Sequence, residues 1–394
     1  TEKIARIIVE VCGFIDQPEP RHTFLIVDGW HVLHGDHEDL MEKLGRIVAD
    51  GLAARVHLVL TATRWSVVRP AIRDLIPQRI ETKLGEPMDS LIDRKAQLKV
   101  PALPGRGLTS SGETMLIALS AQQDVAFIAR SLVADQPPVP RLKLLPISLM
   151  LADLPQLDPE QNSVLLGVGG PKLGAVNWDY LASQHIVCIG AQESGKSTLI
   201  STIIAGLTQI GRERARLVVI DHRRSHLGAI DPDMLAGYSA STQETEKLVA
   251  AMKITLEERL PSAEVTPQQL KDRSWWTGPD IFLIVDNLDL VADMAFAPLL
   301  SVLPHARDVG LHVVITRKSG GCVRALFQPF LAEIKDQSPF IIVLDADKDD
   351  GPLFGVRLKP QPPGRGVMIH HGTQQGLIQI AAADMPEVSE AKAS

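Results

Sequence analysis

The sequence predicts an α/β protein in which helices cover both faces of a mostly parallel sheet. Three observations lead to this class: a glycine-rich loop separates a strand-like run from a helical pattern, strands and helices alternate through the second half of the chain, and a domain-sized segment is repeated. Strands that alternate with helices form parallel sheets with a helix layer on each face.

The composition is typical of a globular protein and argues against several other classes. The 394 residues are 45% hydrophobic and 22% charged, and a chain of this length suggests about two to three domains. The net charge of −7 argues against a large DNA-binding surface, and three distant cysteines indicate a reduced, cytosolic protein. No signal peptide or membrane-length apolar run is visible, and the chain begins at Thr1. We therefore expect a fragment whose membrane anchor lies upstream or on a partner.

The glycine-rich loop is the strongest motif in the sequence. It consists of Gly190, Ala191, Gln192, Glu193, Ser194, Gly195, Lys196 and Ser197, followed by Thr198. An apolar run at 186–189 precedes it and apolar residues at helical spacing follow it, which is the context that a phosphate-binding P-loop requires. Backbone N–H groups would surround the phosphates, Lys196 would reach the β- and γ-phosphates, and Ser197 would bind Mg²⁺. The loop therefore predicts a site for ATP with Mg²⁺.

A long-range duplication organises the rest of the chain. Three pairs of segments match in order, at offsets of 258, 255 and 259 residues: 23–28 with 281–286, 57–61 with 312–316, and 104–107 with 363–366. Ordered matches at nearly constant spacing indicate a repeated domain. Because the second copy has its glycine loop near 190, the corresponding loop of the first copy would fall before Thr1.

The duplication and the proline content predict three parts. Residues 1–135 form the C-terminal part of an ATPase domain without its P-loop portion, 136–160 form a proline-rich linker, and 161–394 form a complete P-loop ATPase domain. In the complete domain we expect strands at 186–189, 217–221, 281–286, 312–316 and 340–344, and a long helix from about 243 to 260.

Two acids are the candidate catalytic residues. Asp286 ends an apolar strand, where a Walker B acid would orient Mg²⁺ together with Ser197. In most motors of this kind a glutamate follows the acid and activates water, but here Asn287 follows Asp286, and Gly29 follows Asp28 in the first copy. Asp289 is the candidate substitute for the missing glutamate, which leaves hydrolysis uncertain.

Two further places in the sequence are predicted to contact nucleotide. Thr316 ends the next strand, where a polar group often senses the γ-phosphate, and Arg317 follows it. Arg307 lies on a loop that would face the phosphates of a neighbouring subunit, as an arginine finger does. A surface salt bridge or a solvated cation is the alternative for each arginine. The repeated Pro-Gly-Arg-Gly segments are expected to form tight turns.

The assembled motifs resemble the FtsK/SpoIIIE-type ATPases of type VII secretion systems, the EccC family. The matching segments in the first copy are 25–30, 61–65, 91–95 and 104–109, and those in the second copy are 190–197, 219–224, 285–289, 305–312 and 363–366. The resemblance implies tandem RecA-like P-loop domains, with the end of the second ATPase domain followed by the whole third.

The resemblance also implies a function. The chain would comprise the ATP- and Mg²⁺-binding, regulatory and substrate-recognising domains of a type VII export motor, with weak or absent hydrolysis. The alternative is an active translocase that hydrolyses ATP to drive protein export; DNA translocation is disfavoured by the acidic balance and the lack of a basic domain after Ala383.

The implied partners follow from the same family. They are small helical secreted proteins of the WXG class, bound through their C-terminal signal, and membrane subunits of the secretion system. No nucleic acid is expected, and related ATPases form rings. The expected location is the cytoplasmic face of the inner membrane, reached through an upstream domain or a partner subunit.

Overall fold

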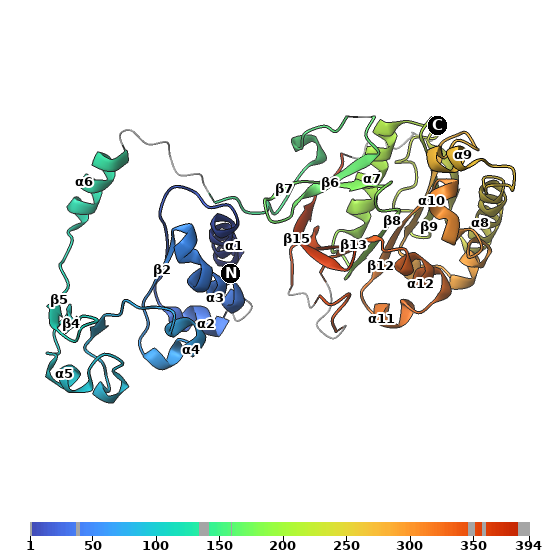
Figure 1. The fold of residues 1–394 in the computed structure, drawn as a ribbon. Coiled ribbons are helices and arrows are strands. Elements are labelled where there is room, and N and C mark those ends of the chain that lie inside the picture. The colour runs from blue at the N-terminus through green and yellow to red at the C-terminus, as the bar shows by residue number, and fades with distance from the viewer. Residues whose placement is uncertain are drawn as a thin grey trace, which may run out of the picture. The chain divides into compact units, whose positions relative to one another are not determined.

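The computed structural model describes residues 2–36, 40–133, 142–158, 160–345, 351–356 and 360–384. The chain divides into two compact units, residues 1–144 and 145–394, which are described separately below (Figure 1). In the part of the chain that the structure describes, no helix is long and apolar enough to cross a membrane.

The second unit is built on a ten-stranded sheet. Its strands, in the order in which they pair, are β10 (Leu235–Ser239), β9 (Ala215–Asp221), β11 (Asp280–Asp286), β12 (Leu311–Lys318), β8 (His185–Gly190), β13 (Phe340–Val343), β14 (Arg365–His370), β15 (Thr373–Ile380), β6 (Ser163–Gly169) and β7 (Gly174–Asp179). The pairs from β10 to β13 are parallel, and the pairs from β13 to β7 are antiparallel. The predicted α/β class with a mostly parallel sheet is confirmed, and an antiparallel flank is added to it.

Helices cover both faces of this sheet, as predicted. The helices are α7 (Lys196–Ile210), α8 (Thr242–Glu257), α9 (Pro267–Asp272), α10 (Ala306–Val309), α11 (Cys322–Ala325) and α12 (Pro329–Asp336), and the short 3₁₀ helices are η5 (Leu151–Asp153), η6 (Leu288–Leu290), η7 (Asp293–Leu299) and η8 (Leu303–His305). Alternate strand residues point to opposite faces, so Phe282 and Ile284 pack with α7, while Leu283 and Val285 pack with α8, η7 and α12.

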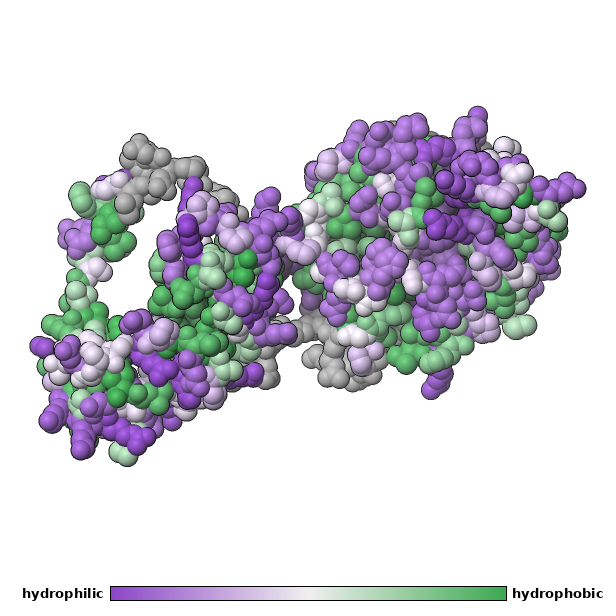
Figure 2. All heavy atoms as spheres, in the orientation of Figure 1, coloured by the Kyte–Doolittle hydropathy of each residue, from purple (hydrophilic) through white to green (hydrophobic). Residues whose placement is uncertain are grey.

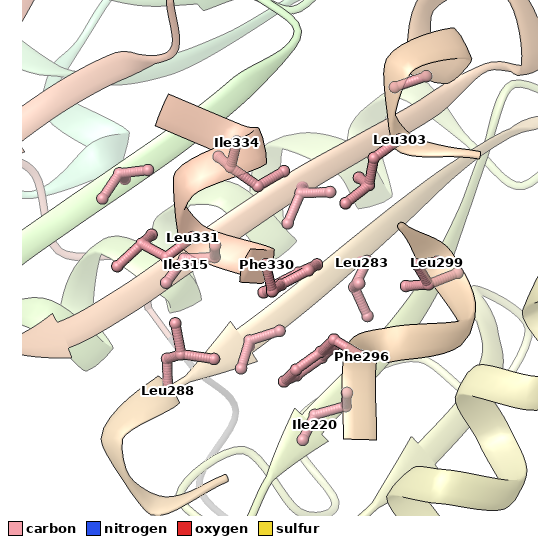
Figure 3. Close-up of a cluster of buried hydrophobic side chains, with 14 of the residues drawn as sticks. Ile220, Leu283, Leu288, Phe296, Leu299, Leu303, Ile315, Phe330, Leu331 and Ile334 are labelled. Carbon is pink, nitrogen blue, oxygen red and sulfur yellow. The ribbon is translucent and has the colours of Figure 1, made fainter. Parts of the chain in front are cut away.

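A mostly aliphatic cluster fills the second of these two faces, and two stacked phenylalanines lie within it. Phe296 of η7 stacks on Phe330 of α12, with ring centroids 4.1 Å apart. Leu283 and Ile315, from adjacent strands, lie beneath them (Figure 3). This core holds β11 and β12 in fixed register, and therefore also holds the polar residues that follow those strands.

The first unit contains two small sheets. Strands β1 (Thr23–Val27) and β2 (Val56–Leu60) are parallel, and β3 (Glu81–Thr82), β4 (Arg106–Leu108) and β5 (Thr114–Leu116) form an antiparallel sheet. The helices are α1 (Glu2–Asp16), α2 (Trp30–Asp36), α3 (Met41–Asp50), α4 (Pro70–Arg73), α5 (Arg94–Lys99) and α6 (Gln122–Val133), with 3₁₀ helices η2 (Gly51–Ala54), η3 (Trp65–Val67) and η4 (Pro87–Asp89).

The internal repeat is visible in these sheets. The pair β1–β2 corresponds to β11–β12, and β3–β4–β5 corresponds to β13–β14–β15. The Pro-Gly-Arg-Gly turns also match: Gly105 and Gly364 have φ of 75° and 76°, and each accepts a backbone hydrogen bond of 2.8 Å, from Ile117 and Ile380 respectively. In the second unit β8 joins the two groups of strands, and the described residues of the first unit contain no such strand.

One apolar face of the first unit is exposed as a result. Phe24 and Ile26 of β1 are 59% and 69% exposed, and Val59 of β2 is 46% exposed. Their counterparts Phe282, Ile284 and Val314 are fully buried in the cluster that α7 covers in the second unit. Figure 2 shows hydrophobic residues reaching the surface of the first unit.

Candidate nucleotide-binding site

The predicted P-loop lies between β8 and α7, at the carboxyl edge of the parallel strands. β8 ends at Gly190, and α7 begins at Lys196 with Gly195 as its N-cap residue. Gly195 has φ 101°, a conformation that favours glycine, and a Cβ there would lie 2.7 Å from the backbone nitrogen of Gly364. A Cβ at Gly190 would overlap Ser194 Oγ. The backbone therefore requires both glycines of the motif.

The loop lines a cavity of about 760 Å³. Its lining consists of residues 191–198, Arg223, Ser225, Asn287, Asp289, Leu290, residues 318–320 and Pro363. The cavity is within the usual size of a small-ligand site. Three cationic side chains, those of Lys196, Arg223 and Lys318, are among the lining residues, and cations at this position suit a polyphosphate.

The polar groups of the loop fit an anionic ligand. Nζ of Lys196 donates hydrogen bonds to the carbonyl oxygens of Gly190 (3.1 Å) and Ala191 (2.6 Å), and burial lowers the pKa of this lysine. Ser194 Oγ is buried and has no hydrogen-bond partner among the described residues. A buried hydroxyl without a partner, beside an ammonium that is held by carbonyl oxygens, is what a phosphate-binding loop presents before the phosphate completes it.

Asp286 ends β11 next to the first turn of α7. It accepts hydrogen bonds from Ser197 Oγ (3.0 Å, to Oδ2) and Thr316 Oγ1 (2.5 Å, to Oδ1), and His226 Nε2 lies 3.2 Å from Oδ2. Burial is the largest influence and raises the pKa of Asp286, but these hydrogen bonds together hold the pKa below its ordinary value of 3.8. The carboxylate is therefore ionised beside the Ser197 hydroxyl, and this pair of oxygen groups fits Mg²⁺.

Thr316 lies beneath the acid. Its side chain is fully buried, and its hydroxyl donates to Asp286 and accepts the backbone N–H of Asn287 at 2.8 Å. Thr316 is not one of the described residues that line the cavity. The structure thus places the predicted γ-phosphate sensor where it fixes the acid and the chain that follows it.

Asp289, the candidate substitute for the missing glutamate, lines the cavity, but its carboxylate is engaged elsewhere. Oδ1 accepts the backbone N–H of Lys318 at 3.1 Å, and Oδ2 lies 3.9 Å from the ammonium of the same lysine. Asn287, which occupies the usual place of the catalytic glutamate, adopts a left-handed conformation with φ 59°. Asp289 therefore holds the end of β12 in place.

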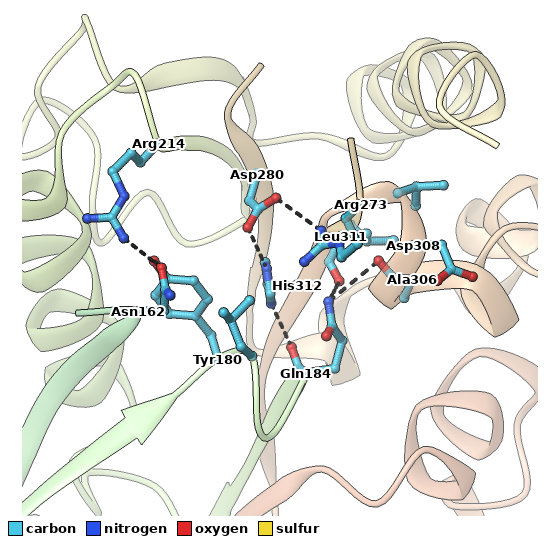
Figure 4. Close-up of polar contacts among 12 residues, drawn as sticks. Asn162, Tyr180, Gln184, Arg214, Arg273, Asp280, Ala306, Asp308, Leu311 and His312 are labelled. Atoms are coloured by element: carbon cyan, nitrogen blue, oxygen red, sulfur yellow. Dashed lines mark hydrogen bonds and ion pairs between the residues drawn. The ribbon is translucent and has the colours of Figure 1, made fainter. Parts of the chain in front are cut away.

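Arg307 lies at the opposite edge of the sheet from the P-loop. It is exposed on α10, just before β12 begins, whereas the P-loop follows the end of the parallel neighbour β8. Gln184 Nε2 anchors this edge by donating to the carbonyl oxygens of Leu311 (2.7 Å) and Ala306 (3.5 Å) (Figure 4). Arg307 is therefore remote from the P-loop of its own chain.

The Pro-Gly-Arg-Gly turn of the second unit has a role beyond that of a tight turn. The backbone N–H of Gly364 donates to the carbonyl oxygen of Ser194 at 2.8 Å, so the turn supports the P-loop directly. Arg365 is buried, and its Nη2 donates to the carbonyl oxygens of Leu145 (3.0 Å) and Pro146 (2.7 Å). The same turn therefore holds the P-loop and part of the predicted linker.

Several site residues were not predicted from the sequence. Arg223, Ser225 and His226 come from the loop after β9, Lys318 follows the predicted Thr316, and Pro363 belongs to the repeated turn. A signal was available for the first three, because a polar run directly after a buried parallel strand lies at the same edge as the P-loop.

The acid and threonine arrangement occurs again in the first unit. Thr61 Oγ1 donates to Asp28 Oδ1 at 2.5 Å and accepts the backbone N–H of Gly29 at 2.9 Å. The corresponding contacts of Thr316 with Asp286 and Asn287 are nearly identical in length. In the first unit this arrangement is exposed.

Comparisons with known proteins give specific relatives, although a scan against models of protein families finds no match. The ESX secretion system protein EccC of Thermomonospora curvata is 37% identical over 96% of this chain, which spans 32% of that relative. The solved structure of T. curvata EccC (ATPases 2 and 3) in complex with a signal sequence peptide is 34% identical, with a TM-score of 0.82 over 97% of this chain and 77% of that one. The cytoplasmic domain of the T. curvata type VII secretion ATPase EccC has a TM-score of 0.81 at 34% identity, over 97% of this chain and 50% of that one.

Proposed function

The chain belongs to the EccC family of type VII secretion ATPases, and from that premise we propose that it is a nucleotide-binding, regulatory and substrate-recognising part of an export motor. The observation that carries the proposal is the P-loop of the second unit, which faces a cavity lined by Lys196, Arg223 and Lys318 and places Ser197 beside the ionised Asp286. The chain aligns with ATPases 2 and 3 of its solved relative.

Each residue of the site has a distinct task in this proposal. The backbone of residues 190–195 would surround the phosphates of ATP, and Lys196, now held by two carbonyl oxygens, would supply positive charge to the phosphates. Ser197 and Asp286 would hold Mg²⁺. Bound Mg²⁺ would neutralise phosphate charge. Arg223 and Lys318 supply further positive charge at the cavity wall.

Hydrolysis is weak or absent in this proposal because a free general base is lacking among the residues at the end of β11. Asn287 cannot accept a proton at neutral pH, and Asp289 is engaged by the backbone and side chain of Lys318. In the alternative, an active translocase, Asp289 would leave Lys318 or a group from a neighbouring subunit would replace it, with Arg307 as a candidate finger toward that neighbour.

The test of these alternatives is phosphate release at saturating ATP with Mg²⁺. We expect turnover near background, and Asp289→Asn should leave it unchanged. Turnover of about 1 per second, within the ordinary range of enzymes, and its loss in Asp289→Asn would favour the translocase. DNA in the assay should have no effect in either case.

We also propose the partners and location that the family suggests. One solved relative is bound to a signal sequence peptide and another is described as cytoplasmic. We infer that this chain binds the C-terminal signal of small helical secreted proteins of the WXG class, at the cytoplasmic face of the inner membrane, next to membrane subunits of the system. Fluorescence anisotropy with a labelled signal peptide tests the first point, and a peptide of scrambled sequence is its control.

For the first unit we propose that it is the C-terminal part of an ATPase domain whose P-loop portion is not in this sequence. The correspondence of β1–β2 with β11–β12 supports this. In the second unit β8 pairs with β12 and leads into the P-loop and α7, so an equivalent strand and helix would lie beside β1–β2 in a complete domain. The exposed apolar face formed by Phe24, Ile26 and Val59 is where such a helix would pack. Nucleotide binding by this chain should therefore have a single site, in the second unit.

A further inference from the structure

The loop that follows β9 brings a second buried carboxylate into the site. Asp221 ends β9, Asp286 ends β11, and the two are direct partners in the register of these parallel strands. Both side chains are buried. Two buried carboxylates this close repel each other unless other groups satisfy them, so the donors that each receives are informative.

Among the described residues, three donors reach Asp221, and two of them belong to the loop. It accepts the backbone N–H groups of Arg223 (3.2 Å, to Oδ1) and His226 (2.8 Å, to Oδ2), and the hydroxyl of Tyr238 (3.0 Å, to Oδ2). The first two bonds fix the backbone of the turn from 222 to 226. Arg223 thereby reaches the nucleotide cavity, and His226 turns toward Asp286.

The imidazole of His226 is fully buried and makes one polar contact with the described residues, that of Nε2 with Asp286 Oδ2 at 3.2 Å. Among the described residues, Nδ1 has no hydrogen-bond partner. An ionised carboxylate only accepts hydrogen bonds, so Nε2 carries the hydrogen. Because buried polar groups need hydrogen-bond partners, the bond from this imidazole to Asp286 indicates that the histidine orients the carboxylate of the Walker B acid.

We propose that His226 is a positioning residue that fixes the Asp286 carboxylate for Mg²⁺, with Asp221 as the anchor of its loop. This inference rests on the proposed binding of ATP with Mg²⁺. Thr316 holds Oδ1 of Asp286, while His226 and Ser197 hold Oδ2. Because Ser197 is itself a predicted Mg²⁺ ligand, His226 is the donor that holds Oδ2 independently of the metal. Partners that orient metal-binding carboxylates set metal affinity as well as position.

A matched pair of variants separates the hydrogen bond from the fold. In His226→Gln the amide nitrogen can take the place of Nε2 and still donate to Asp286. In His226→Asn the same amide chemistry stops short, near the place of Nδ1. His222, in the same loop, contacts Thr245 Oγ1 at 3.0 Å and does not contact Asp286, so His222→Asn is the control. Should His226→Asn not fold, His226→Leu, which has no donor, carries the same prediction.

The experiment is calorimetric titration of the full chain with ATP, once with Mg²⁺ and once with a chelator. His226→Asn should lose about tenfold or more in affinity for ATP with Mg²⁺, the usual effect of removing such a partner, with unchanged affinity for metal-free ATP. His226→Gln and His222→Asn should match the unsubstituted chain in both titrations.

Three results would overturn the inference. The first is that His226→Asn binds ATP with Mg²⁺ as the unsubstituted chain does. The second is that His226→Asn loses both affinities equally, as a general distortion of the loop would cause. The third is that His226→Gln loses as much affinity as His226→Asn. A chain that binds no ATP under either condition refutes the proposed function itself, and with it this inference. The two failures are therefore distinguishable.

Discussion

The contact between Gly195 and Gly364 makes a quantitative prediction for the substitution Gly195→Ala. Gly195 has φ 101°, and an added Cβ would lie 2.7 Å from the nitrogen and 2.9 Å from the Cα of Gly364. The left-handed conformation costs alanine about 1–2 kcal/mol. Forcing the two backbones apart adds about 1–3 kcal/mol, as overpacking does. We therefore expect a total loss of about 2–5 kcal/mol in the free energy of unfolding of the second unit.

Gly321→Ala is the matched control for this substitution. Gly321 is also a left-handed N-cap residue, at the start of α11 with φ 70°, but a Cβ there has no neighbour within 4 Å. Gly321→Ala should lower the free energy of unfolding only by the cost of the left-handed conformation, about 1–2 kcal/mol. Urea unfolding followed by circular dichroism measures both losses, and calorimetry should show ATP binding impaired in Gly195→Ala alone. Equal losses in the two variants would refute the contact as the source of the effect.

Three further predictions concern buried groups and the repeat. Burial lowers the pKa of His185 from 6.5 to about 3, so between these pH values the unfolded chain binds a proton that the folded chain does not. The free energy of unfolding should therefore fall by up to about 1.4 kcal/mol per pH unit from pH 6.5 toward 3. Denaturant titrations across this range should lack this pH-dependent loss in His185→Asn. Thr316→Val should lower the free energy of unfolding by about 1–3 kcal/mol, because it leaves buried groups unpaired. Thr61→Val, at the exposed counterpart, should change it by less than about 0.5 kcal/mol. Urea unfolding measures both changes. Phe282→Ala should lower the free energy of unfolding by about 3–5 kcal/mol. Phe24→Ala, at the exposed counterpart, should change it by less than about 0.5 kcal/mol. Equal losses in these two variants would contradict the exposure of the first unit's apolar face.

Local sequence patterns were sufficient to predict the P-loop and the two strands that end near it. The P-loop, the strand that ends in Asp286 and the strand that contains Thr316 lie where apolar runs and the glycine pattern predicted them, although the last of these strands extends to Lys318. Each is encoded within about ten residues, because a buried parallel strand reads as a continuous apolar run. The repeat was also predictable, since it is a comparison of the sequence with itself.

Contacts between distant segments could not be predicted in the same way. The antiparallel flank of β6, β7, β14 and β15 depends on which strands pair, which short-range patterns do not specify. The support of Ser194 by Gly364 joins residues far apart in the chain, as does the contact of His226 with Asp286. The loop that carries His226 follows a strand of ordinary pattern, and only the register of β9 beside β11 shows that its polar residues reach Asp286.

The central claim is that the second unit binds ATP with Mg²⁺ through its P-loop. The most direct measurement is calorimetric titration of the chain with ATP and Mg²⁺, repeated with Lys196→Ala. We predict binding of a single nucleotide per chain, lost in Lys196→Ala while circular dichroism shows an unchanged fold. Absence of binding, or binding that survives Lys196→Ala, would contradict the claim.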